Sequence, residues 1–193
     1  MLEPGDIIIV AGGRTFLDKL IYWASSTRKQ ECLYSHTEIA AGERVNEILN
    51  TDWDLTFGAL ALVKLSYWKP MPRYRIYGWK SPNDQDTAAQ VLDAMIPELD
   101  GKLYGIQQYF FFGWRKLCNS LHLPKHWAIH QWFNGDYICT TVVNTLIRRV
   151  TERIGVQADY PYGKGALTPL DIVNICEQLV AKGVMVKKED VGS

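Results

Sequence analysis

Two short segments about a hundred residues apart carry the side chains that a thiol hydrolase must bring together. Residues 34–39, with the sequence YSHTEI, read as a strand that carries His36. Residues 136–143, with the sequence DYICTTVV, read as the beginning of a helix that carries Cys139. A cysteine nucleophile needs a neighbouring base, and histidine commonly fills that role. The pair therefore predicts nucleophilic catalysis by a cysteine.

The surroundings of Cys139 favour a reactive thiolate. Apolar residues recur every fourth position from Ile138 to Val150, which predicts a helix over residues 137–150. Residues 134–136, Asn-Gly-Asp, supply turn and N-cap chemistry just before it. Cys139 should then lie in the first helical turn, where unpaired backbone N–H groups stabilise negative charge. The N–H of Cys139 itself is a candidate donor to a substrate oxyanion.

Two carboxylates could orient the imidazole of His36. The sequence predicts two strands joined by a turn around residues 41–43, and period-two geometry puts His36 and Glu38 on one face of the sheet. If the strands pair antiparallel, Glu47 returns toward the level of His36. A carboxylate there would fix the tautomer and stabilise the imidazolium. We rank Glu47 first, because Glu38 would have to reach along its own strand.

The order of these motifs resembles a known family. The circularly permuted papain-like enzymes contain a similar series of motifs in the same order, which in this chain are Gly5–Ile9, Ser35-His36, Val45–Glu47, Tyr137–Thr140 and Thr168–Asp171. These are the YiiX-like relatives of the NlpC-type peptidoglycan peptidases and of lecithin retinol acyltransferase. The resemblance spans roughly residues 4 to 175.

The resemblance implies a permuted papain-like fold in which the histidine precedes the cysteine. It also implies that Cys139 is the nucleophile, His36 the base and Glu47 the third polar group. The family often has a small residue at the position of Glu38 and a serine at that of Thr140. The first difference keeps open which carboxylate orients His36. The implied activity is an amidase or endopeptidase acting on peptidoglycan-type or other peptides through an acyl-enzyme, or a related lipid acyl hydrolase or acyltransferase.

Two other interpretations remain beside this one. A cysteine on an apolar helix face is commonly a small core residue, and a papain-like scaffold can serve as a binding module without turnover. The presence of Cys139, His36 and Glu47 together argues for an enzyme rather than a silent module.

Aromatic residues crowd the segment that leads to Cys139. Tyr104, Trp132 and Tyr137 are the candidate substrate-binding residues, which would stack on sugar rings or hold an acyl chain. Aromatic side chains also fill cores, and for residues 101–135 as a whole we favour a buried helix and its cover. Loss of stability with unchanged binding in Trp132→Ala would support that interpretation.

A metal site is the competing chemistry in this segment. Cys118, His122, His126 and His130 recur every four residues, which would bring them near one helix face. Pro124 interrupts that helix, and the usual paired ligand motif is absent from the sequence. We therefore expect no metal and no other cofactor.

Length and composition favour a single domain over residues 1–193. With 193 residues and 47% hydrophobic content the chain can bury a sizeable core. The apolar pattern predicts strands at residues 7–10, 59–65 and 74–77 and helices at 16–23 and 84–99. We expect an α+β fold, an antiparallel sheet with packed helices. The sequence gives no indication of oligomeric state.

The charge balance and the N-terminal sequence indicate which partners and which cellular location to expect. The 21 basic residues balance 21 acidic ones, so no nucleic-acid surface is expected. The N-terminus has no basic region followed by an apolar stretch, and no segment approaches transmembrane length. The four cysteines are scattered and are expected to be thiols. We expect a cytoplasmic location, with release by cell lysis or export by a partner left open.

Overall fold

A computed structural model gives the structure of the protein. It describes residues 2–11, 16–26, 31–41, 47–51, 63–67, 73–99, 113–114, 116–118, 120–122, 139–160 and 167–191. The strands are β1 Ile7–Val10, β2 His36–Ala40, β3 Glu47–Thr51, β4 Val63–Tyr67, β5 Tyr74–Trp79 and β6 Met185–Val191. The helices are α1 Phe16–Ser25, α2 Pro82–Leu99, α4 Cys139–Arg153 and α5 Pro169–Ala181.

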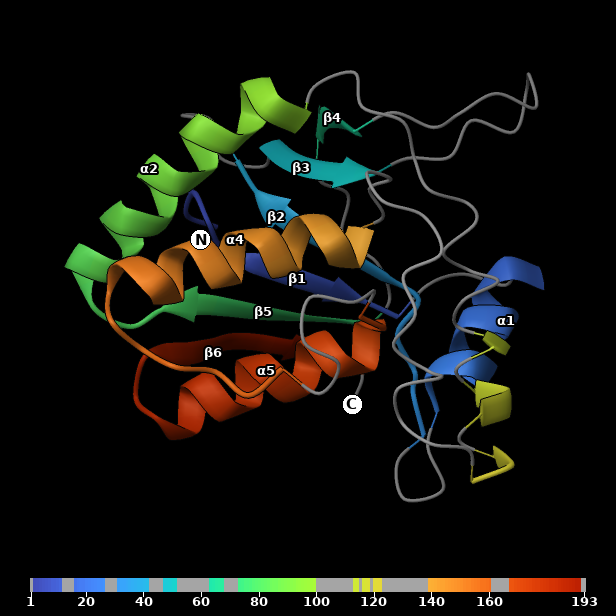
Figure 1. The fold of residues 1–193 in the computed structure, drawn as a ribbon. Coiled ribbons are helices and arrows are strands. Elements are labelled where there is room, and N and C mark those ends of the chain that lie inside the picture. Colours follow the sequence, from blue (N-terminus) through green and yellow to red (C-terminus); the bar gives the residue numbers. More distant parts are fainter. Residues whose placement is uncertain are drawn as a thin grey trace.

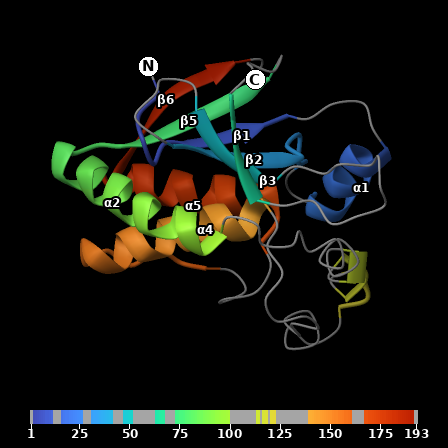
Figure 2. The same ribbon diagram turned by 90° about the horizontal axis from the view of Figure 1, so that it is seen from above.

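The strands form one antiparallel sheet in the order β4-β3-β2-β1-β5-β6. Figure 2 shows α2, α4 and α5 together on one face of this sheet, whereas α1 stands apart near the ends of the strands. The expected α+β class, an antiparallel sheet with packed helices, is therefore confirmed.

The alternation of side chains along β1 explains how the sheet separates two apolar clusters. Ile7 and Ile9 are fully buried in the large cluster that also contains side chains of α2, α4 and α5. Ile8 and Val10 belong to a smaller cluster with Tyr74 of β5. A strand that is buried on both faces forms the centre of the sheet, and β2 is its direct neighbour.

Most of the expected elements lie where the apolar pattern places them. The strand at Ile7–Val10, the helix beginning at Phe16, the hairpin strands and the helix that ends at Leu99 are all present. Of the expected strand at 59–65, residues 63–65 lie in the strand Val63–Tyr67, and residues 59–62 are outside the described residues. The apolar spacing of α1 includes Trp23, but that residue is 54% exposed, and Ile96, in the apolar spacing of α2, is only half-buried. The elements α5 and β6 were not predicted.

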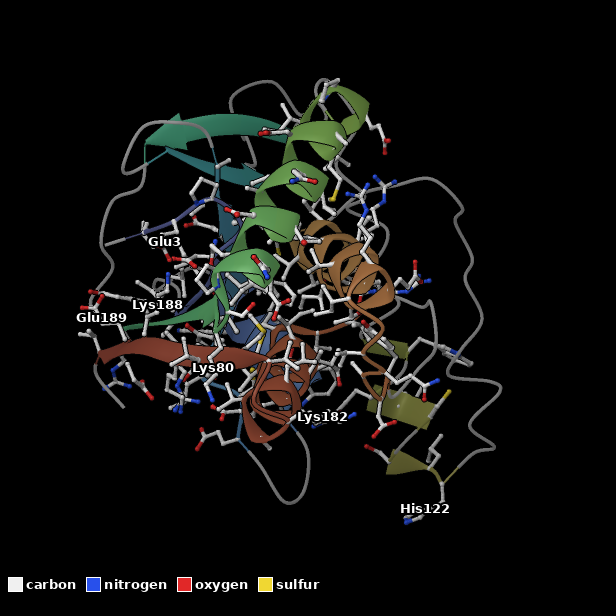
Figure 3. The ribbon with its side chains drawn as sticks, turned by 90° about the vertical axis from the view of Figure 1, so that its left-hand side faces the viewer. Glu3, Lys80, His122, Lys182, Lys188 and Glu189 are labelled. Carbon is white, nitrogen blue, oxygen red and sulfur yellow. The ribbon has the colours of Figure 1, made fainter. Side chains whose placement is uncertain are left out.

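A charge cluster ties the last strand to the beginning of the chain. Lys188 of β6 lies 2.9 Å from Oδ2 of Asp6, whose side chain is fully buried, and also pairs with Glu3. Figure 3 shows Lys188 and Glu3 close together at this side of the sheet. The side chain of Lys188 passes over Gly78 of β5, where any side chain would collide with it. Glycine at this position therefore leaves the space that the ion pair uses.

Within the described ranges, no helix is long and apolar enough to cross a bilayer.

Candidate active site

Cys139 is the first residue of α4, in agreement with its expected place in the first turn. Its side chain is buried, with 3% of the residue exposed. The backbone N–H groups of a first helical turn have no partner within the helix, and the helix dipole is positive at this end. The position therefore favours an anionic sulfur, provided that other groups offset the cost of its burial.

Helix α4 packs on β2, and this contact brings Cys139 to the beginning of that strand. Figure 1 shows the N-terminal end of α4 over the region where β2 starts. Burial by itself raises the pKa of the Cys139 thiol, but His36 opposes it through its charge and a hydrogen bond, and Thr37 contributes in the same direction through its backbone and side chain. The resulting pKa lies below that of an ordinary thiol.

His36 opens β2, and its imidazole also faces a carboxylate. The Nε2 atom lies 3.5 Å from Oε1 of Glu38, and the two side chains are 28% and 12% exposed. This separation is long for a hydrogen bond and suits an ion pair once the imidazole is protonated. The expectation that His36 and Glu38 share a face agrees with their register positions opposite Val10 and Ile8.

The register of β2 with β3 differs from the one expected for Glu47. Leu49 pairs with Ile39 and Ile48 pairs with Ala40, so one further step along the strands sets Glu47 level with Ala41. Residue 41 is five positions beyond His36, which corresponds to about 16 Å along an extended strand. That distance exceeds the combined reach of a glutamate and a histidine side chain. The side chain of Glu47 is outside the part that the structure describes.

Hydrogen bonds around Cys32 hold the segment that leads into His36. The N–H of Cys32 donates to Oγ of Ser26 over 2.9 Å, and that hydroxyl donates to the carbonyl oxygen of Tyr22 in α1 over 2.7 Å. The thiol of Cys32 donates to the carbonyl oxygen of Tyr34 over 3.3 Å. The N–H of Ser35 donates to the carbonyl oxygen of Val10 over 3.1 Å. These hydrogen bonds fix the backbone of the segment that leads into His36, where β2 begins.

The first turn of α5 supports the same segment. Thr168 and Asp171 form a capping box, in which the Thr168 N–H and hydroxyl each donate to Oδ2 of Asp171 over 2.8 Å. The backbone of Leu170, in this turn, contacts the thiol of Cys32. The Thr-Pro-Leu-Asp motif that was noted in the sequence therefore has a structural role, because it begins the helix on which the approach to His36 rests.

Two buried hydroxyls lie on the elements that form the site. Thr37 is 1% exposed and Thr140 is fully buried. Among the described residues, the Oγ1 atom of Thr140 has no hydrogen-bond partner, and that of Thr37 has none besides the Cys139 sulfur. Neither residue was predicted as functional, although both adjoin a predicted residue in the sequence. Threonine is common in strands and helices for reasons of packing, so its type alone gives no signal of a role in chemistry.

The other cysteines differ from Cys139. All four cysteines are buried and none forms a disulfide. Burial raises the pKa of Cys32 to about 11 and also raises that of Cys176, whose side chain is fully enclosed in the core under α5. These two thiols are thus protonated and unreactive near neutral pH.

Several sequence predictions fall on parts of the chain that are not described. Tyr104, Trp132 and Tyr137, the candidate substrate-binding residues, lie outside the described residues. Of the four residues considered for a metal, Cys118 and His122 are described, and His122 is exposed on the outside of the fold (Figure 3), whereas His126 and His130 are not. Groups of three or more metal-ligating side chains are absent from the described segments.

Comparison with models of known protein families gives no match for this chain. Comparison with curated proteins finds no significant match either. The arrangement of Cys139, His36 and Glu38 is therefore the basis on which a function is proposed.

Proposed function

We propose that this protein is a cysteine hydrolase that cleaves an amide or ester bond through an acyl-enzyme on Cys139. The observation that carries the proposal is the contact between Cys139 and His36, which lowers the pKa of a fully buried thiol. Burial alone would raise that pKa, as it does for Cys32 and Cys176. A thiolate beside an imidazolium is the resting state that thiol hydrolases use.

The reaction follows from the groups present. The Cys139 thiolate adds to the substrate carbonyl carbon, and the imidazolium of His36 gives its proton to the departing nitrogen or oxygen as the bond to that atom breaks. The resulting thioester is attacked by water, which loses a proton to the neutral imidazole. Collapse of this second intermediate expels the thiolate and releases a carboxylic acid. The helix N-terminus supports the oxyanion at both additions, with the N–H of Cys139 as the nearest donor.

Glu38, rather than Glu47, is the carboxylate that we assign to His36. Its Oε1 atom is at an ion-pair distance from Nε2, whereas the strand register carries Glu47 away from the imidazole. A carboxylate at Nε2 keeps the ring oriented and stabilises its protonated form. Since the carboxylate contacts the base and not the reacting atoms, Glu38 is a positioning residue.

The scaffold that we propose is the permuted papain-like one, with the histidine strand before the cysteine helix. What supports it is an antiparallel sheet whose second strand begins with His36 and a covering helix that begins with Cys139. By this resemblance the substrate is a peptide, with peptidoglycan-type stem peptides tested first and lipid acyl esters second. The alternative is a binding module on the same scaffold that has no turnover.

An acyl-transfer burst tests the proposal without knowledge of the substrate. The protein is mixed with nitrophenyl esters of a short and a long carboxylic acid, and release of nitrophenolate is followed together with intact mass. We expect a burst of up to one equivalent, one added acyl group per chain, and peptide mapping of that group to Cys139. Hydrolysis of stem peptides and of long-chain esters then separates the peptidase from the lipid hydrolase.

Two variants serve as controls in this experiment. Cys139→Ser should abolish the burst, whereas Cys176→Ala, which removes another buried thiol, should retain it. A parent protein that shows no burst with either ester and no acyl group on Cys139 would contradict the proposed function and favour the binding module.

A further inference from the structure

The hydroxyl of Thr37 is placed where it can serve the nucleophile. Thr37 pairs with Ile9 across β1 and β2, and Ile9 belongs to the core beneath the helices. Directly paired residues of antiparallel strands project to the same face, so Thr37 faces α4. His36, opposite Val10, projects to the other face and reaches Cys139 from the first position of the strand. Its side chain takes part in the interaction with the Cys139 thiol.

This hydroxyl is also an anomaly. Thr37 is 1% exposed, and among the described residues its Oγ1 atom has no hydrogen-bond partner besides the Cys139 sulfur. Buried hydroxyls are nearly always hydrogen-bonded, because leaving one unpaired loses its interaction with water and gains nothing in return. A buried donor whose one neighbouring acceptor is a reactive sulfur is therefore expected to bond best to the charged state of that sulfur.

We propose that the Thr37 hydroxyl is a hydrogen-bond donor reserved for the Cys139 thiolate, so that two consecutive residues of β2 hold the nucleophile in its charged form. A neutral thiol is a weak acceptor, whereas a thiolate accepts strongly and can turn the hydroxyl proton toward itself. The inference rests on the proposed function, since it assigns a further group to the same nucleophile.

The donor would act twice in a turnover. In the resting site it stabilises the thiolate beside the imidazolium. In the acyl-enzyme the sulfur carries no charge, and the hydroxyl loses its acceptor. When the thioester is hydrolysed the sulfur leaves as a thiolate, and the hydroxyl stabilises it again. Thr37 therefore favours both the formation of the nucleophile and its release.

Within the described part of the chain, few charged groups compete with the interaction between Thr37 and Cys139. Among the described residues, His36 is the charged group that acts on the Cys139 sulfur, and Glu38 lies behind it on the same strand. The helix α2 packs on α4, but the ion pair between them, Glu98 with Arg149, lies beyond the middle of α4 and away from Cys139. A change in the titration of Cys139 after substitution of Thr37 can therefore be assigned to the hydroxyl.

The test compares Thr37→Val, which replaces the hydroxyl by a methyl group of similar shape, with Thr37→Ser, which keeps the hydroxyl. The ultraviolet absorbance of the thiolate is titrated in each protein, with Cys139→Ser as the blank, and alkylation of Cys139 is timed at about pH 6. We expect Thr37→Val to move the thiolate titration to higher pH and to slow alkylation about three- to tenfold, as loss of one charge-assisted hydrogen bond predicts. Thr37→Ser should restore most of the rate.

The outcomes separate this inference from the proposed function. If Thr37→Val titrates and reacts like the parent protein while His36→Ala is strongly impaired, the inference is overturned and the cysteine–histidine pair stands. If neither variant differs from the parent, both fail. Equal slowing in Thr37→Val and Thr37→Ser would also overturn the inference, because packing would then explain the effect. Should Thr37→Val not fold, Thr37→Ala compared with Thr37→Ser gives the same contrast.

Discussion

The Nε2 atom of His36 lies 3.5 Å from Oε1 of Glu38, two residues further along the same strand. Side chains two positions apart in a strand project to the same face, so a single strand supplies both the base and the carboxylate beside it. This arrangement does not depend on the pairing of β2 with β3. The same imidazole interacts with the thiol of Cys139, at the beginning of α4.

Replacing Glu38 by glutamine should lower kcat/KM about ten- to a hundredfold, because the imidazolium loses the negative charge that stabilises it. The upper pH limit of activity should also move down, since the imidazolium then gives up its proton at lower pH. The pH profile of ester or peptide hydrolysis measures both effects. If Glu38→Gln instead lowers the stability of the protein and leaves the upper pH limit of activity unchanged, packing and not charge explains its effect.

Glu47→Gln is the matched comparison for Glu38→Gln. Both substitutions remove one carboxylate from the hairpin, but the register sets Glu47 level with Ala41 rather than His36. We expect the effect of Glu47→Gln on kcat/KM to be at least fivefold smaller, as separation from the base predicts. The reverse order of effects would show that Glu47 acts on the imidazole and that our assignment to Glu38 is mistaken.

The thiols of Cys32 and Cys176 should be inert in the native protein. Burial raises the pKa of Cys32 to about 11 and raises that of Cys176 as well, so only about one Cys32 side chain in ten thousand is ionised at neutral pH. With iodoacetamide at neutral pH, we expect Cys139 to be labelled first and these two only as fast as the protein unfolds. Addition of denaturant should make all four cysteines react. Early labelling of Cys176 would contradict its enclosure in the core.

Loss of Lys188 should destabilise the fold in a pH-dependent way. Lys188→Met leaves the carboxylate of Asp6 buried without its cation, which should lower the free energy of unfolding by about 2–3 kcal/mol at neutral pH. Burial raises the pKa of Asp6 above its ordinary value. A carboxyl with a raised folded-state pKa contributes stability below its unfolded pKa and loses it as pH rises through the folded pKa. The defect should therefore shrink as pH is lowered from 7 toward about 4.

Denaturant titrations of the parent and Lys188→Met at several pH values test this expectation. Lys80→Met is the control, because Lys80 is exposed at the end of β5 (Figure 3). Its effect should stay within about 0.5 kcal/mol at every pH. A defect in Lys188→Met that is constant from acid to neutral pH would show that the packing of its stem over Gly78, and not its charge, is what matters.

The capping box of α5 should contribute to both stability and reactivity. Thr168→Ala removes a hydroxyl that caps the N–H of Asp171 and binds its carboxylate, at a cost of about 1–2 kcal/mol in the free energy of unfolding. Because Leu170 in this turn contacts Cys32, alkylation of Cys139 should also slow modestly as the segment before His36 loosens. Thr168→Ser should recover most of the free energy of unfolding and most of the alkylation rate. Urea unfolding and labelling rates, measured on the same samples, check the prediction.

Much of this fold could be predicted from local patterns. The run of apolar residues at Ile7–Val10 and the spacing of Ala88, Val91, Leu92 and Met95 in α2 specify elements whose buried sides are as expected. The turn residues before Cys139 likewise placed it at the first turn of a helix. Each of these features depends on a few neighbouring residues, which is why the sequence reveals them.

Other features depend on tertiary pairing. The sequence pattern of a hairpin does not determine the register in which its two strands pair. Glu47 was therefore expected beside His36, whereas the observed register of β2 and β3 sets it level with Ala41. The strand β6 is mostly exposed, and its Lys-Lys-Glu-Asp run lacks the apolar alternation that predicts a strand. The helix α5 did have a local signal, the Thr168–Asp171 capping box with Pro169 between, which was noted only as part of a family resemblance. That the Thr37 hydroxyl has no described partner besides the Cys139 sulfur follows from packing alone.

The central claim is that Cys139 and His36 form a thiolate–imidazolium pair, and the pH dependence of alkylation at each cysteine tests it most directly. We expect Cys139 to react well below the pH of about 8.5 at which a free thiol ionises, and His36→Ala to slow that reaction at least tenfold near neutral pH. Labelling of Cys139 that begins only at alkaline pH and is unchanged in His36→Ala would contradict the account and leave Cys139 as a structural cysteine.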